Sequence, residues 1–441
     1  MQSDIITLDF EDKLSLPEDV SIHTIGEKTL FIDVQQPSWV ALENPETEAL
    51  RRLLRGATIG DAFDAIRSYG YSDEVSAKYL QALLTKVNNH SFQKQSSTRK
   101  KDYFTIQVHL TNRCNIRCSH CYVESGKPFN NELGKEDWIE IIKAVAAYHE
   151  NVHLSISGGE PLTVPWLLDF VEEAYSQFGC SISMLTNAML WTNEFAKKVS
   201  PYLEQVSVSF DGSTEEVHDK IRGHGAYKKA LKGLYIIAEN GIPITLNMTL
   251  MRSNRENLLN NMVSFVDGLP FMVNVEIANY ILEGRGLANT HEPLTHKEFV
   301  TTLNIITPQL LRGNFVPSKI AKRSNCGYGT SLAIYANGSV SPCLTPRFIQ
   351  GNFLKTNATE IVEGIMRGYQ ASLVDKLPLC KSCDLRYLCG GRCHLSQLTK
   401  SLPISQNECL SSYRQNFYLG LIDQFERQQK SFDSIVNLIS V

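Results

Sequence analysis

The chain has 441 residues, more than one hydrophobic core usually supports, so two or three domains are expected. Its 43% hydrophobic and 20% charged residues are typical of a globular protein and exclude a disordered or fibrous one. The net charge of −4 has the wrong sign for a nucleic-acid footprint, and no run of about 18 apolar residues predicts a membrane helix. Because the first residues are acidic and lack a long apolar run, we expect a cytoplasmic protein with neither nucleic acid nor membrane as a partner.

The first part of the chain predicts one extended stretch, residues 29–42, followed by three helices. The helical patterns cover residues 45–55, 58–68 and 72–88. This order predicts a small winged-helix-like domain over residues 1–92. The polar, serine- and lysine-rich stretch that follows predicts a linker over residues 93–102.

Residues 103–315 alternate short β-rich runs with longer amphipathic stretches. The predicted strands lie at residues 103–110, 153–157, 181–187, 205–210, 243–250 and 271–277, and helices are predicted at 135–148 and 226–240. Six β-α units predict an α/β fold with a parallel sheet, a partial (β/α)6 TIM-like barrel. The working residues of such folds lie after the carboxyl ends of the strands.

Residues 316–441 have short segments and seven cysteines between Cys326 and Cys409. The chain has eleven cysteines and no export signal, so reduced thiols with metal or redox roles are expected. Because these short segments offer too little regular secondary structure for an ordinary hydrophobic core, we expect metal centres to stabilise this region. We therefore predict a cysteine-rich iron-sulfur domain.

Three cysteines follow the first predicted strand of the α/β region at C-x3-C-x2-C spacing: Cys114, Cys118 and Cys121. Three thiolates on one loop can hold three irons of a four-iron cluster and leave the fourth iron open to a ligand. The alternatives are a zinc site with His120 as the fourth ligand and three incidental buried thiols.

This spacing, followed by Tyr122, resembles the radical S-adenosylmethionine (radical SAM) enzyme superfamily. The sequence S-G-G-E-P at residues 157–161, Asn187 and Ser209 come at later strand ends, and Arg222 follows Ser209 in the segment 218–223, in the order expected for that superfamily. The resemblance implies that the cofactor S-adenosylmethionine is bound by Tyr122, Gly158, Gly159, Glu160, Pro161, Asn187, Ser209 and Arg222.

Four of these residues have a chemistry that suits the contact implied for them. The two glycines permit a close backbone approach, Glu160 accepts from an ammonium group, and a guanidinium such as that of Arg222 binds a carboxylate in a bidentate pair. A plain turn at the glycines, a turn aspartate at Asp211 and a surface ion pair of Arg222 are the alternatives.

The resemblance also implies the chemistry. An electron donor such as flavodoxin or ferredoxin reduces the cluster. The reduced cluster cleaves S-adenosylmethionine to a 5'-deoxyadenosyl radical, which removes hydrogen from a substrate.

The seven C-terminal cysteines resemble the SPASM extension of radical SAM enzymes. The resemblance implies two auxiliary four-iron clusters, and so three clusters in all. Their implied ligands are Cys326, Cys343 and Cys393 for one, and Cys380, Cys383, Cys389 and Cys409 for the other. The set of three leaves an open iron that could bind a peptide thiolate. A zinc ribbon over residues 380–393 is the alternative, and the remaining Cys180 is expected to be a small buried apolar residue.

The order of elements in residues 1–92 resembles the PqqD-like recognition domain that binds the leader of a precursor peptide as an added strand. A DNA-binding winged helix is the alternative. The whole layout resembles subtilosin-type thioether synthases, which join a cysteine sulfur to a carbon of a ribosomal precursor peptide. A carbon-carbon or carbon-oxygen cross-linker, a peptide epimerase and a formylglycine-forming sulfatase maturase share every motif and stay open. No general acid or base is assigned.

Overall fold

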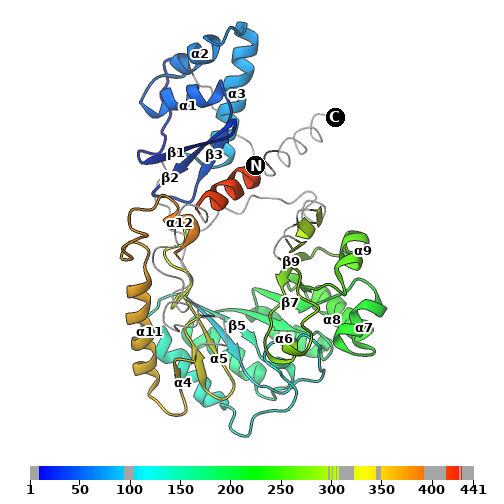
Figure 1. Ribbon diagram of the computed structural model, residues 1–441. Helices are drawn as coiled ribbons and strands as arrows, with labels where there is room; N and C mark the ends of the chain where they lie inside the picture. The colour runs from blue at the N-terminus through cyan, green and yellow to red at the C-terminus, as the bar shows by residue number, and fades with distance from the viewer. Residues whose placement is uncertain are drawn as a thin grey trace. The chain divides into compact units, whose positions relative to one another are not determined.

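The structure, a computed structural model, describes residues 9–93, 104–295, 298, 299, 301–303, 305, 306, 322–343, 349–391, 414–426 and 429. The chain divides into two compact units, whose labelled elements are drawn in Figure 1. Unit 1 comprises residues 1–100, 315–327 and 371–441, and unit 2 comprises residues 101–314 and 328–370. Residues 328–370 thus group with the α/β region, and the described residues 9–93, 371–391 and 414–426 group in unit 1.

Unit 1 begins with an antiparallel sheet of order β1-β2-β3, followed by three helices. Their bounds are β1 Val20–Ile25, β2 Lys28–Asp33, β3 Trp39–Leu42, α1 Glu46–Leu54, α2 Ile59–Arg67 and α3 Asp73–Asn89. The three predicted helices are confirmed. Thr58 and Ser72 cap α2 and α3, since each side chain accepts from the backbone three residues on. The predicted stretch 29–42 is two strands joined by a turn, and β1 was not predicted.

The core of unit 1 joins the N-terminal elements to the C-terminal part of the chain. Leu30, Phe31 and Val40 from the sheet share one buried cluster with Leu385 and Leu388, which lie in or beside α12 Arg386–Cys389. The same cluster receives Tyr418, Leu421 and Phe425 from the helical residues 414–426. The cysteine-rich segment thus packs on a hydrophobic core that residues 1–92 supply.

Unit 2 is built on a nine-stranded sheet of order β12-β11-β10-β4-β5-β6-β7-β8-β9. Six of the strands run parallel in sequence order, namely β4 Phe104–His109, β5 Val152–Ser157, β6 Ser181–Thr186, β7 Gln205–Ser209, β8 Ile244–Leu250 and β9 Asn274–Asn279. All six predicted strands and the α/β class are confirmed.

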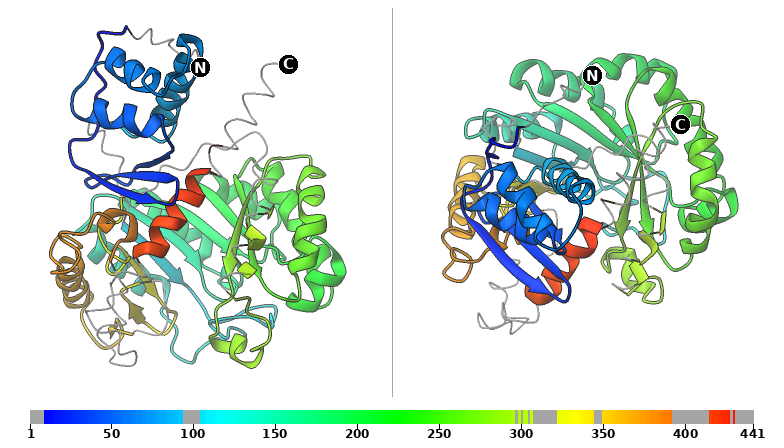
Figure 2. Two further views of the ribbon diagram at one scale, coloured as in Figure 1. Left: turned by 45° about the horizontal axis from the view of Figure 1, so that its top comes forward. Right: turned by 90° about the horizontal axis from the view of Figure 1, so that it is seen from above.

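Helices cover one face of this curved sheet (Figure 2). They are α4 Lys135–Ala146, α5 Leu167–Phe178, α6 Asn193–Val199, α7 Glu215–Arg222, α8 Ala226–Glu239 and α9 Arg255–Asp267. Both predicted helices, α4 and α8, are confirmed. Alternate strand residues such as Ile106 and Val108 are fully buried against the helices, where they meet Trp138 and Ile142 of α4. The residues between the buried positions of β4, Thr105 and Gln107, are half-buried.

Three strands beyond residue 328 extend the sheet past β4. They are β10 Ser331–Ile334, β11 Ser339–Ser341 and β12 Gly351–Asn352. β10 pairs with β4 in parallel, and β11 and β12 follow antiparallel, so the sheet is mixed. α11 Ala358–Ser372 buries Ile361, Val362 and Ile365 in the same core. These strands were not predicted, because they are short and lie among the cysteines.

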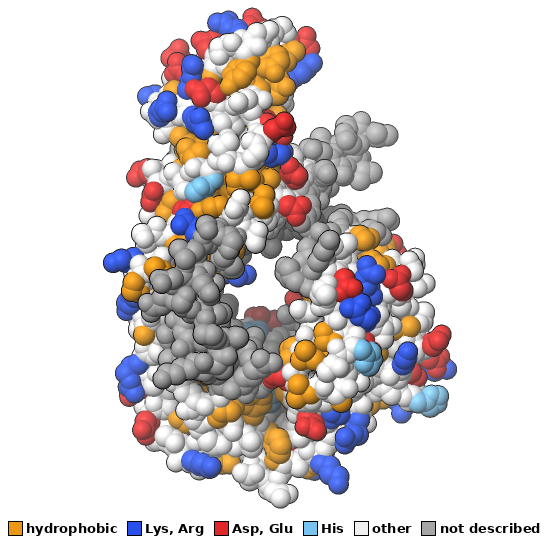
Figure 3. All heavy atoms as spheres, viewed as in Figure 1, with side chains coloured by type: hydrophobic (Ala, Val, Ile, Leu, Met, Phe, Trp, Pro, Cys, Tyr) orange, Lys and Arg blue, Asp and Glu red, His pale blue; other side chains and the backbone are white. Residues whose placement is uncertain are grey.

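Basic and acidic side chains are interspersed over the face of the molecule shown in Figure 3. No helix within the described ranges has the length and apolar character needed to cross a membrane.

Candidate active site

The three cysteines of the C-x3-C-x2-C motif lie on the loop after β4, residues 110–126, called here the cysteine loop. Glu132 holds its start, since its carboxylate accepts from the hydroxyl of Thr111 at 2.7 Å and from the backbone N–H of Asn112 at 2.7 Å. The loop is closed by backbone bonds from Cys114 N to Gly126 O and from Gly126 N to Asn112 O. The motif therefore has a fixed backbone at both ends.

Each thiol has a polar neighbour. The amide Nδ2 of Asn187 lies 4.0 Å from Cys114 Sγ, the Nη1 of Arg222 donates to Cys118 Sγ at 3.8 Å, and the Ser125 hydroxyl is 3.2 Å from Cys121 Sγ. Hydrogen bonds to sulfur are a principal means by which proteins tune iron-sulfur clusters. Burial raises the pKa of the Cys118 thiol to about 11, so its thiolate needs a positive partner, which iron supplies.

In the described part of the chain, no group of three or more His, Cys, Asp or Glu side chains could hold one metal ion. A four-iron cluster does not require the three thiolates to converge on one metal ion, because each thiolate binds its own iron. The donor set of three thiols with N–H and O–H neighbours fits such a cluster. The imidazole of His120, the fourth ligand of the zinc alternative, instead faces Asp211 at 3.4 Å.

Gly158 and Gly159 follow β5 and pack against the cysteine loop. Gly158 has φ +131°, and a Cβ there would lie 2.6 Å from the carbonyl oxygen of Thr111. A Cβ on Gly159 would overlap the carbonyl of Arg113, and Gly159 N donates to Thr111 O at 2.7 Å. The close approach that these glycines permit is therefore to the loop that carries the cysteines.

Glu160 is completely buried between two strand ends. Its carboxylate accepts from the hydroxyl of Thr186 at 2.7 Å and from the backbone N–H of Asn187 at 2.8 Å, at the end of β6. Burial raises the pKa of Glu160 to about 7, although these hydrogen bonds oppose the rise. Glu160 thus joins the loop after β5 to the loop after β6.

Asn187 completes this link to the motif. Its Nδ2 donates to Asn115 Oδ1 at 2.8 Å, and its Oδ1 accepts from Met189 N at 3.0 Å. The structure therefore brings Glu160 and Asn187 together with Cys114, as the order along the chain predicted.

Asp211 and Arg222 form a buried ion pair beside Cys118. Arg222 Nε lies 2.7 Å from Asp211 Oδ2, and the backbone N–H of Thr249 donates to the other carboxylate oxygen at 2.8 Å. Burial would raise the pKa of Asp211, but the charges of Arg222 and His120 hold it below its ordinary value. The guanidinium is thus fixed in orientation, with its Nη1 directed at a cysteine sulfur.

The other predicted cofactor residues lie nearby. Ser209 is the last residue of β7, and Pro161 opens the short 3-10 helix η1 Pro161–Thr163. Tyr122 lines a cavity of about 310 Å³ beside the cysteine loop. Burial raises the pKa of Tyr122 to about 12, while a hydrogen bond with Gln107 opposes the rise.

Arg285, on η3 Gly284–Ala288 after β9, was missed by sequence reasoning. Its guanidinium donates to Cys118 O at 2.9 Å and to Ser125 O at 2.6 Å, and its backbone N–H donates to Cys121 O at 3.0 Å. The loop after the last strand of the predicted barrel therefore holds the loop after the first. No motif marks this arginine, and only its place after a strand could have drawn attention to it.

The auxiliary cysteines are described in part. Cys380, Cys383 and Cys389 lie close in sequence within unit 1, where Cys383 and Cys389 pack against the core. Cys326 belongs to unit 1 and Cys343 to unit 2, while Cys393 and Cys409 lie outside the described residues. The expectation for Cys180 is confirmed, because it is 1% exposed in the core of unit 2.

Residues 108–265 match the model of the Radical SAM superfamily. The chain is similar to the sporulation killing factor maturation protein SkfB of Bacillus subtilis (strain 168), at 34% identity over 154 residues, which are 34% of this chain and 37% of SkfB. It is also similar to the antilisterial bacteriocin subtilosin biosynthesis protein AlbA of the same organism, at 25% identity over 344 residues, 73% of this chain and 75% of AlbA. The match to SkfB thus spans little more than a third of that protein.

A solved structure of native anSMEcpe with bound AdoMet and Cp18Cys peptide has the same fold, with 17% sequence identity and a TM-score of 0.55 over 76% of this chain and 99% of that chain. The family match covers the cysteine loop and strands β5 to β8, where the thiols and their polar neighbours meet. S-adenosylmethionine and one four-iron cluster are the cofactors that this match implies. The part of the chain that carries the cysteine loop is therefore similar to radical SAM enzymes.

Proposed function

We propose that this enzyme is a peptide maturase that cleaves S-adenosylmethionine reductively, removes hydrogen from a ribosomally made precursor peptide and forms a sulfur-to-carbon thioether in it. The observation that carries the radical chemistry is the cysteine loop, where each of three thiols has a polar neighbour: Asn187 after β6, Arg222 at the end of α7, and Ser125 in the loop itself. When bound there, the cluster and S-adenosylmethionine supply a 5'-deoxyadenosyl radical.

The chain's own residues hold this site in shape. Cys114, Cys118 and Cys121 would bind three irons of the cluster. Glu160 and Arg222 orient the surrounding loops, since the carboxylate of Glu160 is occupied by the end of β6 and Arg222 Nε by Asp211. We therefore expect the amino and carboxylate groups of S-adenosylmethionine to contact exposed backbone after β5, Ser209 and the remaining guanidinium nitrogens of Arg222.

Two features support a peptide as the substrate. The similarity to AlbA, a subtilosin biosynthesis protein, extends over 73% of this chain and so beyond the superfamily domain. Unit 1 offers an antiparallel sheet with outer strands β1 and β3, to which a leader peptide could add as a further strand. The seven C-terminal cysteines would hold two auxiliary clusters, and an open iron on one of them would bind the substrate thiolate.

Mass spectrometry of a cysteine-containing precursor peptide encoded beside the gene tests this function. The peptide is co-expressed with the enzyme without oxygen and is measured before and after thiol alkylation. We expect a loss of two hydrogens for each modification, with an equal loss of alkylatable thiols. A Cys118→Ala enzyme is the control, because it lacks one proposed iron ligand.

The alternatives give different masses. A loss of two hydrogens with all thiols still free would replace the thioether by a carbon-carbon or carbon-oxygen cross-link. An unchanged mass with altered residue chirality would indicate an epimerase. A cysteine converted to formylglycine would indicate a sulfatase-type maturase.

A further inference from the structure

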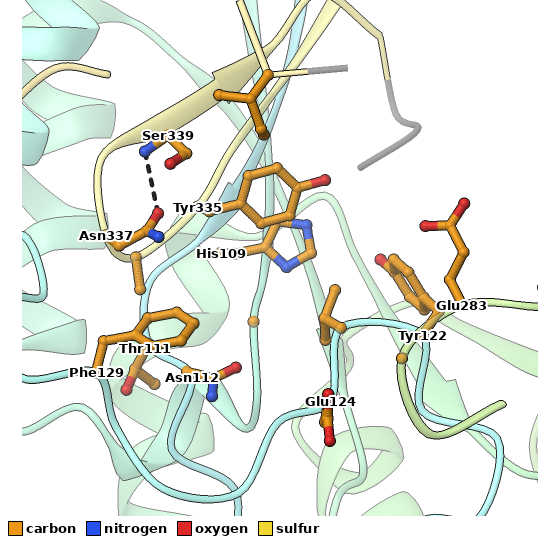
Figure 4. Close-up of a pocket in the computed structure, with 15 residues that line it drawn as sticks. His109, Thr111, Asn112, Tyr122, Glu124, Phe129, Glu283, Tyr335, Asn337 and Ser339 are labelled. Carbon is orange, nitrogen blue, oxygen red and sulfur yellow. Dashed lines mark hydrogen bonds between the residues drawn. The ribbon is translucent and has the colours of Figure 1, made fainter. Parts of the chain in front are cut away.

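The cavity beside the cysteine loop lies entirely within unit 2. Its lining includes Tyr122 and Gly158, which are predicted to contact S-adenosylmethionine, and also His109 and Tyr335, to which no role has been assigned. Its volume is about 310 Å³, at the lower end for sites that bind a small ligand. It is bounded by the end of β4, the turn between β10 and β11, the second half of the cysteine loop and the loop after β9. Figure 4 shows His109 and Tyr335 at its centre.

His109 is a buried polar residue without a described partner. It is 3% exposed, and neither ring nitrogen makes a hydrogen bond within the described residues. Burial lowers its pKa to about 4, so at neutral pH the ring carries one N–H donor and one acceptor nitrogen. Leaving such a pair unsatisfied destabilises the protein, which indicates that a ligand completes it.

Tyr335 presents a second such group beside it. Its ring stacks on His109 with 4.8 Å between centroids and 18° between planes, and its hydroxyl has no hydrogen-bond partner in the described part of the chain. The hydroxyl of Tyr122, on the facing wall, is already bonded to Gln107. Within the described lining, His109 and Tyr335 are therefore the two residues whose buried side-chain polar atoms lack a hydrogen-bond partner.

The charges around the cavity select against an acidic ligand. Its described lining contains Glu124 and Glu283 but no lysine or arginine. Glu124 is exposed, whereas the deep end at His109 is uncharged. Placing a cation there without an ion pair would be costly. An uncharged group that both donates and accepts fits best.

The position of the cavity connects it to the proposed peptide chemistry. Tyr122, on one wall, follows the cluster ligand Cys121 in the chain. On another wall, Ser339 opens β11, which ends two residues before the auxiliary cysteine Cys343. A ligand in the cavity would therefore contact segments that lead to both cysteines.

We infer that this cavity binds an uncharged hydrogen-bonding side chain of the precursor peptide, a serine, threonine, asparagine or glutamine, through His109 and Tyr335. This inference rests on the proposed function. Filling the cavity would fix the register of the peptide, and so determine which neighbouring residue is modified.

A double-mutant cycle between enzyme and peptide tests the inference. Each serine, threonine, asparagine and glutamine of the precursor core is replaced by alanine in turn, and the enzyme carries His109→Phe or Tyr335→Phe. We expect one peptide position at which alanine raises KM about tenfold, the effect of about one buried hydrogen bond. Either enzyme variant should raise KM similarly for the natural peptide and add little for the alanine peptide.

The controls separate binding from folding and from radical formation. His149→Phe alters a histidine that stacks on Phe104, near the opposite end of β4, and should leave KM unchanged. Formation of 5'-deoxyadenosine without peptide should be the same in all variants. Tyr335→Phe removes one oxygen atom only, so it remains informative if His109→Phe fails to fold.

The outcomes distinguish the two proposals. Additive effects at every peptide position, or an unchanged KM in Tyr335→Phe, would overturn the inference while the wild-type enzyme still modifies the peptide. A wild-type enzyme that cleaves S-adenosylmethionine but modifies no peptide would overturn the proposed function, and this inference with it.

Discussion

At the scale of single residues, Gly159 shows how closely the cysteine loop is packed. Because a Cβ there would overlap the backbone of Arg113, Gly159→Ala must displace the loop that carries the thiols. We expect a destabilisation of about 3 kcal/mol and less iron bound per chain. Thermal unfolding and iron analysis after anaerobic reconstitution measure both. Gly364→Ala, in the open surroundings of α11, is the control and should be neutral or slightly stabilising. Equal iron in the two variants would contradict the prediction.

Arg285 provides a second prediction at this scale. Its guanidinium holds the carbonyls of Cys118 and Ser125, so Arg285→Met leaves two carbonyl groups without their charged donor. We expect at least half of the cluster iron to be lost after desalting, with an unchanged far-ultraviolet circular dichroism spectrum. Arg252→Met removes an exposed arginine that pairs with Glu298, and it should retain its iron. Full iron retention in Arg285→Met would contradict this prediction, because the cysteine loop would then keep its conformation without Arg285.

The candidate site could be predicted in part from the sequence. The cysteine spacing located the motif loop, and the strand-end positions of Glu160 and Asn187 brought them to the same edge of the sheet, which Arg222 reaches from the end of α7. Their partners could not be predicted, because the sequence does not reveal that Glu160 faces β6 or that Arg222 pairs with Asp211. Such contacts depend on side-chain directions that only the packed strands determine.

At the scale of elements, the parallel strands were predictable because each is a short run with β-branched residues, and five of them, β4 to β8, bury residues on the helix-covered face. β10 and β11 were missed although Asn337 and Gly338 form a typical hairpin turn, with Gly338 at φ +80°. The pairing of β10 with β4 joins residues more than 200 positions apart. No local pattern encodes a contact of that range.

The end of α3 provides a pH-dependent prediction. Burial lowers the pKa of His90 to about 4, and its ring packs on Phe425 at 4.2 Å. Since the unfolded chain binds this proton from about pH 6.5 downward and the folded chain does not, stability decreases as the pH falls from 6.5 toward 4.

Between pH 7 and pH 5, His90 should account for about 1 to 2 kcal/mol of this loss. Urea unfolding at both pH values checks it, and His90→Phe should lose less stability on acidification than the wild type. His224→Phe, at a fully exposed histidine, is the matched control. Identical losses in His90→Phe and wild type would contradict the assignment.

At the scale of the whole molecule, Asp384 joins the two ends of the chain within unit 1. It accepts from Ser21 and His23 of β1 at 2.9 and 2.6 Å, and from Arg414 and Tyr418 at 2.6 and 2.9 Å. Asp384→Asn should destabilise unit 1 by about 3 kcal/mol, because a buried charge network loses its anion. Asp375→Asn, at an exposed carboxylate, should cost under about 1 kcal/mol. Chemical denaturation of both variants compares them, and equal losses would refute the role of Asp384.

The shared core of unit 1 also decides how leader recognition can be tested. Deleting residues 1–95 would expose Leu385, Leu388 and Tyr418, so lost activity would not identify a leader site. A proline substitution in an outer strand, β1 or β3, tests leader binding more selectively than this deletion does. The bonds from Val34 N to Asp19 O and from Asp33 N to Ser38 O set the pairing, and they direct the amides of Ile22 and Ala41 away from β2.

Proline at one of these two positions should therefore remove a donor to an added strand without breaking the sheet. We expect Ile22→Pro or Ala41→Pro to weaken binding of a fluorescent leader peptide at least tenfold, measured by anisotropy. Circular dichroism and iron content should match the wild type. A leader-free core peptide should still be modified slowly by the affected variant, because the radical site lies in unit 2. Unchanged binding in both variants would rule out strand addition at either edge and leave unit 1 as a support for the cysteine-rich segment.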